Sequence, residues 1–264
     1  MSWKMALPMY NASPRLRAGY EELLAALMEQ AGLEGLGTHV REPALPDFWR
    51  RADLLFSQTC GYPYLRLLAG RATLVATPCY DVPGCSGSDY ASALVVRADG
   101  AMRTLADARG RIAAVNDAHS NSGMNALRHA VAPLARDGRF FGRVTWSGSH
   151  AASLALVREG SADIAAIDCV TYAYLSGEDP AAVAGLTVLA WSAPAPSLPL
   201  IAGRAVPATW VRRLRAALLA PGPRLQAALG PLRIVGFRHV EDAGYARVAR
   251  LEEAARALGY PELA

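Results

Sequence analysis

The stretch Asn116-Asp-Ala-His-Ser-Asn-Ser-Gly-Met124 joins an apolar run at residues 111–116 to an amphipathic segment at residues 124–135. The apolar run is typical of a buried strand, and the spacing of apolar residues after Met124 predicts a helix. Hydroxyl groups and backbone N–H groups at the start of a helix can bind an anion. The sequence therefore predicts an α/β unit with a serine-rich turn at the carboxyl end of a strand.

Strands and helices are predicted to alternate on both sides of this turn. The predicted strands are short apolar runs, at residues 6–10, 52–57, 72–78, 91–97, 111–116, 144–146, 163–167, 186–190 and 200–202. The predicted helices are amphipathic, at residues 15–31, 62–69, 124–135, 150–158, 208–219 and 245–258. Such alternation favours mostly parallel sheets flanked by helices.

The proline-rich segment Trp191-Ser-Ala-Pro-Ala-Pro-Ser-Leu-Pro199 has no helical periodicity and indicates a crossing between two lobes. We predict a discontinuous lobe 1 formed by residues 1–91 and 192–264. Lobe 2 is predicted to span residues 92–191. The two crossings, near residues 91 and 192, would form a hinge.

Composition excludes several classes of protein. The 264 residues are 52% hydrophobic and 19% charged with a net charge of +4, which is typical of a globular protein. No block of five like charges and no zinc-finger spacing occurs, so a nucleic-acid partner is not expected. No run of eighteen apolar residues occurs, so the chain is not expected to span a membrane. The amino-terminal residues carry no export signature, which leaves a periplasmic protein with its signal removed or a cytoplasmic protein.

The cysteine spacing and the catalytic motifs that were considered indicate neither a metal site nor a catalytic site. Cys60, Cys79, Cys85 and Cys169 lack CxxC spacing, which disfavours zinc or thioredoxin-type sites. Cys79 and Cys85 flank a turn and could pair in an oxidising compartment, although packing as free thiols is the simpler interpretation. GxSxG, P-loop, GxGxxG and HExxH motifs are absent. We therefore expect no catalytic residues, no cofactor and no bound metal.

Further candidate ligand contacts lie at other strand ends. Ser149 and His150 open the helix at 150–158, where Ser149 could cap it and His150 could contact a ligand or be a buried histidine. Asp168 follows a strand and could accept from a ligand or cap the next helix. In lobe 1 the candidates follow strands or lie near the expected cleft wall; they are Tyr10, Ser57, Gln58, Thr59 and Tyr80.

Four motifs occur in order within residues 90–175: Leu105-Ala-Asp-Ala-Arg-Gly-Arg111, Ser120-Asn-Ser-Gly123, Gly148-Ser-His150 and Glu159-Gly-Ser-Ala-Asp163. In this order they resemble the substrate-binding proteins of phosphate, phosphite and phosphonate ABC transporters. Three features depart from the family pattern, and the first is the missing export signature. Asn121 replaces a threonine that is common there, and residues 80–87 do not align.

The resemblance implies a two-lobed type II periplasmic-binding-protein fold that captures a small phosphonate- or phosphate-like anion in the inter-lobe cleft. An ABC transporter permease would be the partner, with ligand sensing as the other role. Combined with the strand-end residues above, the expected ligand contacts are Tyr10, Ser57, Gln58, Thr59, Tyr80, Ser120, Asn121, Ser122, Gly123, Ser149, His150 and Asp168.

Two other functional classes remain open. One is a cytoplasmic enzyme of the same architecture, similar to menaquinone-pathway lyases or to proteins that form the thiamine pyrimidine. The missing export signature favours this class, and the lack of a catalytic pair disfavours it. The other is the effector domain of a transcription regulator, which would need a DNA-binding segment from a partner.

Overall fold

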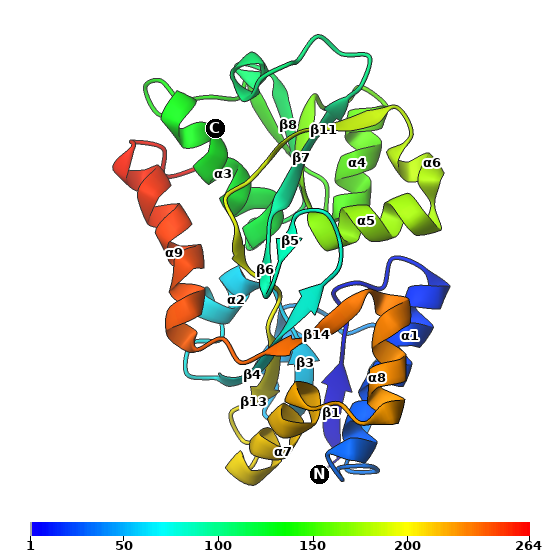
Figure 1. Cartoon of the computed structure of the whole chain (residues 1–264). Helices are drawn as coiled ribbons and strands as arrows, with labels where there is room; N and C mark the ends of the chain where they lie inside the picture. Colours follow the sequence, from blue (N-terminus) through cyan, green and yellow to red (C-terminus); the bar gives the residue numbers. More distant parts are fainter. Residues whose placement is uncertain (1) are drawn as a thin grey trace. The chain divides into compact units, whose positions relative to one another are not determined.

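The computed structural model describes residues 2–264 and divides them into two compact units (Figure 1). Unit 1 contains the chain up to Asp81, Ser86–Asp89 and Pro196–Tyr245. Unit 2 contains Val82–Cys85, Tyr90–Ala195 and Ala246–Ala264. Each unit has a sheet flanked by helices, so the predicted α/β class is confirmed.

The carboxyl-terminal segment is divided differently from the predicted lobes. The prediction assigned all of residues 192–264 to lobe 1, whereas residues 246–264 pack in unit 2. The division falls within helix α9 (Asp242–Ala257). In unit 2 the Asn125 side chain donates to the Val248 carbonyl at 2.9 Å, and Arg128 donates to the Pro261 carbonyl at 2.8 Å. These long-range hydrogen bonds have no signature in the local sequence.

The sheet of unit 1 is mixed. Strands β1 (Trp3–Ala6), β2 (Gly37–His39) and β3 (Leu54–Gln58) pair in parallel. Strand β13 (Leu200–Gly203) runs antiparallel to both β3 and β4 (Ala72–Tyr80), and β14 (Ile234–Arg238) runs antiparallel to β4. The sheet is therefore less parallel than predicted, because β13 and β14 return from the distant carboxyl-terminal part of the chain. In spatial order the strands are β14, β4, β13, β3, β1 and β2.

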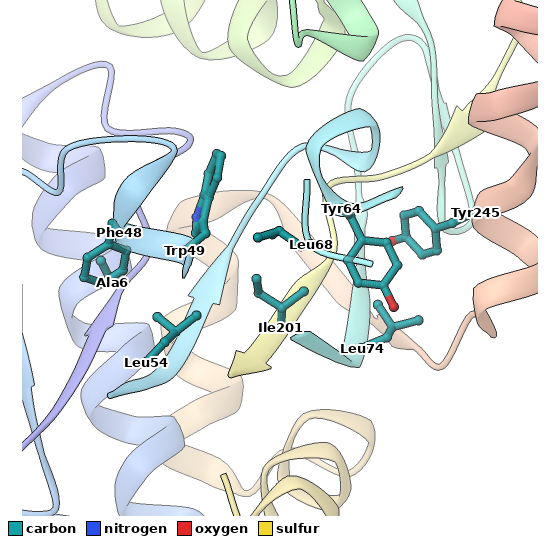
Figure 2. Packing of buried hydrophobic residues seen from close by; sticks show 9 residues of the cluster. All are labelled: Ala6, Phe48, Trp49, Leu54, Tyr64, Leu68, Leu74, Ile201 and Tyr245. Atoms are coloured by element: carbon teal, nitrogen blue, oxygen red, sulfur yellow. The ribbon is translucent and has the colours of Figure 1, made fainter. Parts of the chain in front are cut away.

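Helices of unit 1 cover this sheet and close its core. Helix α1 (Pro14–Gln30) begins as predicted, because the Ser13 hydroxyl accepts from the Leu16 N–H at 3.1 Å. Figure 2 shows a buried hydrophobic cluster that includes Leu54 of β3, Ile201 of β13 and Tyr245 of α9. The remaining helices are α2 (Gly61–Arg66), α7 (Ala208–Leu219), α8 (Pro223–Leu229) and 3₁₀ turns at Asp47–Arg50 and Gly230–Leu232.

The sheet of unit 2 brings three strand ends to one edge. Its order is β11 (Leu186–Trp191), β7 (Ser92–Arg97), β10 (Ile164–Asp168), β8 (Ile112–Val115) and β9 (Arg143–Trp146). Strands β10, β8 and β9 are parallel, and β7 is antiparallel to β10 and β11. The segments that follow β8, β9 and β10 therefore start at the same edge of the sheet.

Helices in unit 2 pack on this sheet. Helix α4 (His150–Arg158) buries Leu154 and Val157 in a cluster with residues of β7, β8 and β10. The helix predicted at 124–135 is in fact a π-helical turn (Asn121–Asn125), then α3 (Ala126–Val131), then a 3₁₀ turn (Ala132–Leu134). The remaining helical elements are α5 (Cys169–Glu178), α6 (Pro180–Val183) and a 3₁₀ turn at Leu105–Ala108.

Two-residue strands β5 (Cys85–Ser86), β6 (Asp89–Tyr90) and β12 (Ala195–Pro196) form a small third sheet. The strand predicted at residues 6–10 is wrong, because β1 ends at Ala6. Within residues 2–264, no helix combines the length and apolar character needed to cross a bilayer.

Candidate functional site

Two polar turns lie beside each other at the carboxyl ends of β8 and β9. The strands are paired in parallel up to Val115 and Trp146. Beyond this pair, the Gly148 N–H donates to the Asn116 carbonyl at 3.1 Å. This bond holds the turn that precedes α4 against the turn that precedes α3.

The first turn is closed by its own serines. The Ser120 hydroxyl caps the π-helical turn by accepting from the Gly123 N–H at 2.9 Å. Ser122 Oγ lies 3.4 Å from Ser120 Oγ, and both side chains are buried. The turn therefore presents two hydroxyl groups and the first N–H groups of a helical segment in one place.

Ser122 also joins the first turn to the second. Its Oγ lies 3.0 Å from Nε2 of His150, the first residue of α4. Gly123 permits this approach, because a Cβ there would lie 1.7 Å from Asn116 Oδ1 and 3.3 Å from His150 Cε1. Asn116 Oδ1 is buried and has no hydrogen-bond partner within the described part of the chain. Ser122, His150 and Asn116 thus converge on Gly123.

His150 is held neutral in this site. Burial lowers the pKa of His150 to about 4, and the backbone of Ala166 opposes the shift. Near neutral pH one ring nitrogen therefore carries a proton, and the other can accept a hydrogen bond. With the proton on Nε2, the ring donates to Ser122 Oγ and leaves the Ser122 hydroxyl hydrogen available to a ligand.

His150→Gln is expected to reduce the acid sensitivity of the fold. The pKa of His150 is lower in the folded protein than the value of about 6.5 in an unfolded chain, so the unfolded chain takes up the proton first as pH falls. Between about pH 6.5 and pH 4 the wild-type protein should therefore lose about 2 kcal/mol of unfolding free energy through His150. This value is smaller than the full pKa shift would give, because the ring is partly exposed.

Urea unfolding of the wild-type protein and the variant over this pH range measures the effect. Burial also lowers the pKa values of His39 and His129, which contribute equally to both proteins. The difference between the two pH profiles therefore isolates His150. Parallel profiles would show that His150 is not held neutral.

Other predicted ligand-contact residues of unit 2 make structural hydrogen bonds. Ser149 is exposed and caps α4 by accepting from the Ala152 N–H at 3.1 Å. The Asp168 carboxylate accepts from the Val170 and Thr171 N–H groups at 2.8 and 3.0 Å, which is the capping alternative considered above. Asn121 donates to the Tyr90 hydroxyl at 3.1 Å and accepts from Asn125 at 2.9 Å.

Predicted aromatic residues of unit 1 form one cluster. The rings of Tyr10 and Tyr80 meet edge to face with centroids 5.6 Å apart. Tyr20 stacks on Tyr10 at 6.2 Å, and its hydroxyl lies 3.2 Å from the Tyr80 hydroxyl. Tyr20 was not among the predicted ligand contacts, and it is one of the buried residues of α1.

Ser57, Gln58 and Thr59 are buried at the end of β3. Their side chains mainly bond locally: Ser57 Oγ and Thr59 Oγ1 each lie 3.4 Å from the carbonyl of the next residue. Gln58 donates to the Leu198 carbonyl at 3.4 Å. Two buried amide oxygens of unit 1, Gln58 Oε1 and Asn11 Oδ1, have no partner among residues 2–264.

A family model described as "ABC transporter, phosphonate, periplasmic substrate-binding protein" matches residues 5–245. This chain belongs to that family. The phosphonate-binding family serves transport, and nothing in the comparison supports the enzyme alternative. No curated protein sequence matches the chain.

Solved structures share the fold of this phosphonate-family protein at low identity. The binding component of a Pseudomonas aeruginosa phosphonate ABC transporter has a TM-score of 0.80 at 17% identity, over 98% of this chain and 87% of that one. PhnD1 of Prochlorococcus marinus, in complex with methylphosphonate, has a TM-score of 0.79 at 15% identity, over 97% and 98%. A Xanthomonas citri protein bound to ATP has a TM-score of 0.72 at 18% identity, over 98% of both chains.

A buried polar chain behind the serine turn of this phosphonate-family protein was not predicted. Asn125 donates to Asn121 at 2.9 Å and accepts from Arg128 at 2.7 Å. Arg128 in turn lies 3.8 Å from Glu252 of α9. In the sequence, Arg128 and Glu252 are charged residues within predicted helices, and such positions usually face solvent, so their burial was not expected.

Within residues 2–264, no three His, Cys, Asp or Glu side chains come together to hold a metal ion.

Proposed function

We propose that this chain binds a small phosphonate- or phosphate-type anion at the turn Ser120–Gly123 and the start of α4. The observation that carries the proposal is the 3.0 Å contact between Ser122 Oγ and His150 Nε2, which joins two helix starts. Family membership and the methylphosphonate in the Prochlorococcus marinus neighbour agree with this ligand class.

Neutral donors perform the binding in this proposal. His150 orients the Ser122 hydroxyl toward a ligand oxygen, and the Ser120 hydroxyl lies beside it. Backbone N–H groups at the two helix starts add their partial positive charge. Such donors suit a tetrahedral oxyanion because each oxygen accepts several hydrogen bonds. Ligand contacts by Ser149, Asp168 and Asn121, and by Tyr10, Ser57, Gln58, Thr59 and Tyr80 of unit 1, remain predictions.

We further propose that the protein delivers its ligand unchanged to an ABC transporter permease outside the cytoplasm, as the family description implies. The proposal includes no catalytic step. Phosphorus-31 NMR of methylphosphonate incubated with the protein should show a single unaltered phosphonate signal. A new phosphorus signal would favour the enzyme alternative.

Isothermal titration calorimetry of the full chain tests the binding proposal. Methylphosphonate is expected to bind with a dissociation constant of about 1 μM or lower, which corresponds to about −8 kcal/mol. Phosphate is the isosteric anion for comparison, acetate tests anion shape, and ATP tests the larger ligand of the Xanthomonas citri protein. Absence of heat with both methylphosphonate and phosphate, in protein shown to be folded, would overturn the proposal.

A further inference from the structure

Cys85 and Cys169 form a thiol pair inside unit 2. Their Sγ atoms lie 3.4 Å apart, although the residues are 84 positions apart in the sequence. The structure does not bond Cys79 to Cys85, the pairing considered from the sequence; none of the four cysteines is in a disulfide bond, and Cys79 belongs to unit 1. Cys169 is the first residue of α5, and Cys85 ends a short segment of unit 2.

Backbone hydrogen bonds hold the two cysteines opposite each other. Ala91 bridges them, because its N–H donates to the Gly84 carbonyl at 2.8 Å and its carbonyl accepts from the Cys169 N–H at 3.3 Å. Gly84 has a φ of +93°, and a Cβ there would lie 2.9 Å from Cys169 Cβ and 2.5 Å from Trp191 Cζ3. The chain at Gly84 is therefore pressed against the start of α5 in a conformation that suits glycine.

We propose that Cys85 and Cys169 are a reversible dithiol–disulfide site that links the segment Val82–Cys85 to the start of α5. A disulfide bond is about 2.05 Å long, so side-chain rotation has to close about 1.4 Å. The backbone bonds around Ala91 already fix the approach. This inference rests on the geometry of unit 2 and not on the proposed ligand.

The two thiols have different roles in bond formation. Cys85 is half-buried and can meet a small-molecule disulfide, whereas Cys169 is buried. The hydrogen bond to Cys85, burial and the Asp168 carboxylate raise the pKa of Cys169, so it stays a thiol until a disulfide sulfur is next to it.

The reaction balances with oxidised glutathione as the oxidant. The Cys85 thiolate attacks one sulfur of oxidised glutathione, the glutathione S–S bond breaks, and one glutathione thiolate leaves. Cys169 then loses its proton to solvent and attacks Cys85 Sγ, and the bond to the second glutathione breaks. Two protein thiols are oxidised, one disulfide is reduced, and the released glutathiones carry the two protons.

The test oxidises the native full-length chain with oxidised glutathione, blocks remaining thiols under denaturing conditions, and counts them. The free thiols are expected to fall from four to two. The melting temperature should rise by about 5 °C or more, because the bond closes a long loop, and dithiothreitol should reverse both changes. A count that stays at four, or glutathione adducts without an internal bond, would overturn the proposal.

Mapping the bond requires one additional variant. Trypsin leaves residues 72–97 as one peptide that carries both Cys79 and Cys85, so the Cys79→Ser protein is used. In that protein peptide 72–97 should be joined to peptide 159–204, which contains Cys169. Cys60→Ser should retain the bond, whereas Cys169→Ser should stop at one glutathione on Cys85. A bond that involves Cys60 would contradict the assignment.

Discussion

Replacing Glu252 by alanine is expected to lower the free energy of unfolding by about 3–5 kcal/mol. Glu252 and Arg128 are only 3% and 4% exposed and lie 3.8 Å apart. Without the carboxylate, the guanidinium of Arg128 remains buried with no counter-charge from Glu252. Urea unfolding followed by circular dichroism measures the loss.

Arg256→Ala is the matched control for this prediction. Arg256 contacts the same carboxylate at 2.8 Å, but its side chain is 60% exposed. Its removal should cost less than about 1 kcal/mol. The double variant Arg128→Met/Glu252→Met should be more stable than Glu252→Ala, because neither charge is then left buried alone. Equal losses in Arg256→Ala and Glu252→Ala would refute the importance of the buried pair.

Ser122→Ala is expected to weaken methylphosphonate binding about 10- to 100-fold. The variant removes one donor to the ligand and leaves His150 Nε2 without its partner at 3.0 Å. The folded structure should persist, because Ser120 still caps the turn through the Gly123 N–H. Calorimetry gives the affinity, and the melting temperature should change by no more than a few degrees.

Ser176→Ala provides the comparison for the binding experiment. The Ser176 hydroxyl donates to the Tyr172 carbonyl within α5 at 2.7 Å and belongs to neither helix start of the site. The Ser176→Ala variant should bind methylphosphonate with the affinity of the wild-type protein. The proposed role of Ser122 would be disproved by an unchanged affinity in Ser122→Ala, or by an equal loss in both variants.

Local signals in the sequence predicted many elements well. Ser13-Pro14 marks the start of α1, and the periodic helices α4 and α7 begin and end at the predicted residues. The strand β14 was missed because its five residues are mostly half-buried or exposed and include Gly236. Such a strand lacks both the alternation and the continuous apolar run that sequence patterns detect.

The candidate site was predictable only in part. A serine-rich turn between a strand and a helix can be recognised from the local sequence, and so can a histidine at the start of a helix. The contact of Ser122 with His150 depends on the parallel pairing of β8 with β9, which places two distant turns side by side. The support from Val248 and Glu252 comes from more than a hundred residues away, where no local pattern reveals it. Asp168 was ambiguous because one carboxylate suits a ligand and a helix cap equally.

The late position of β13 in the sequence delays completion of the unit 1 sheet while the protein is being synthesised. This strand fills the position between β3 and β4, yet about 120 residues separate the end of β4 from Leu200. At about 5–20 residues per second, a ribosome needs roughly 6–24 s to make them. Throughout that interval the edges of β3 and β4 that β13 later joins have no pairing partner, and unpaired strand edges are prone to aggregation.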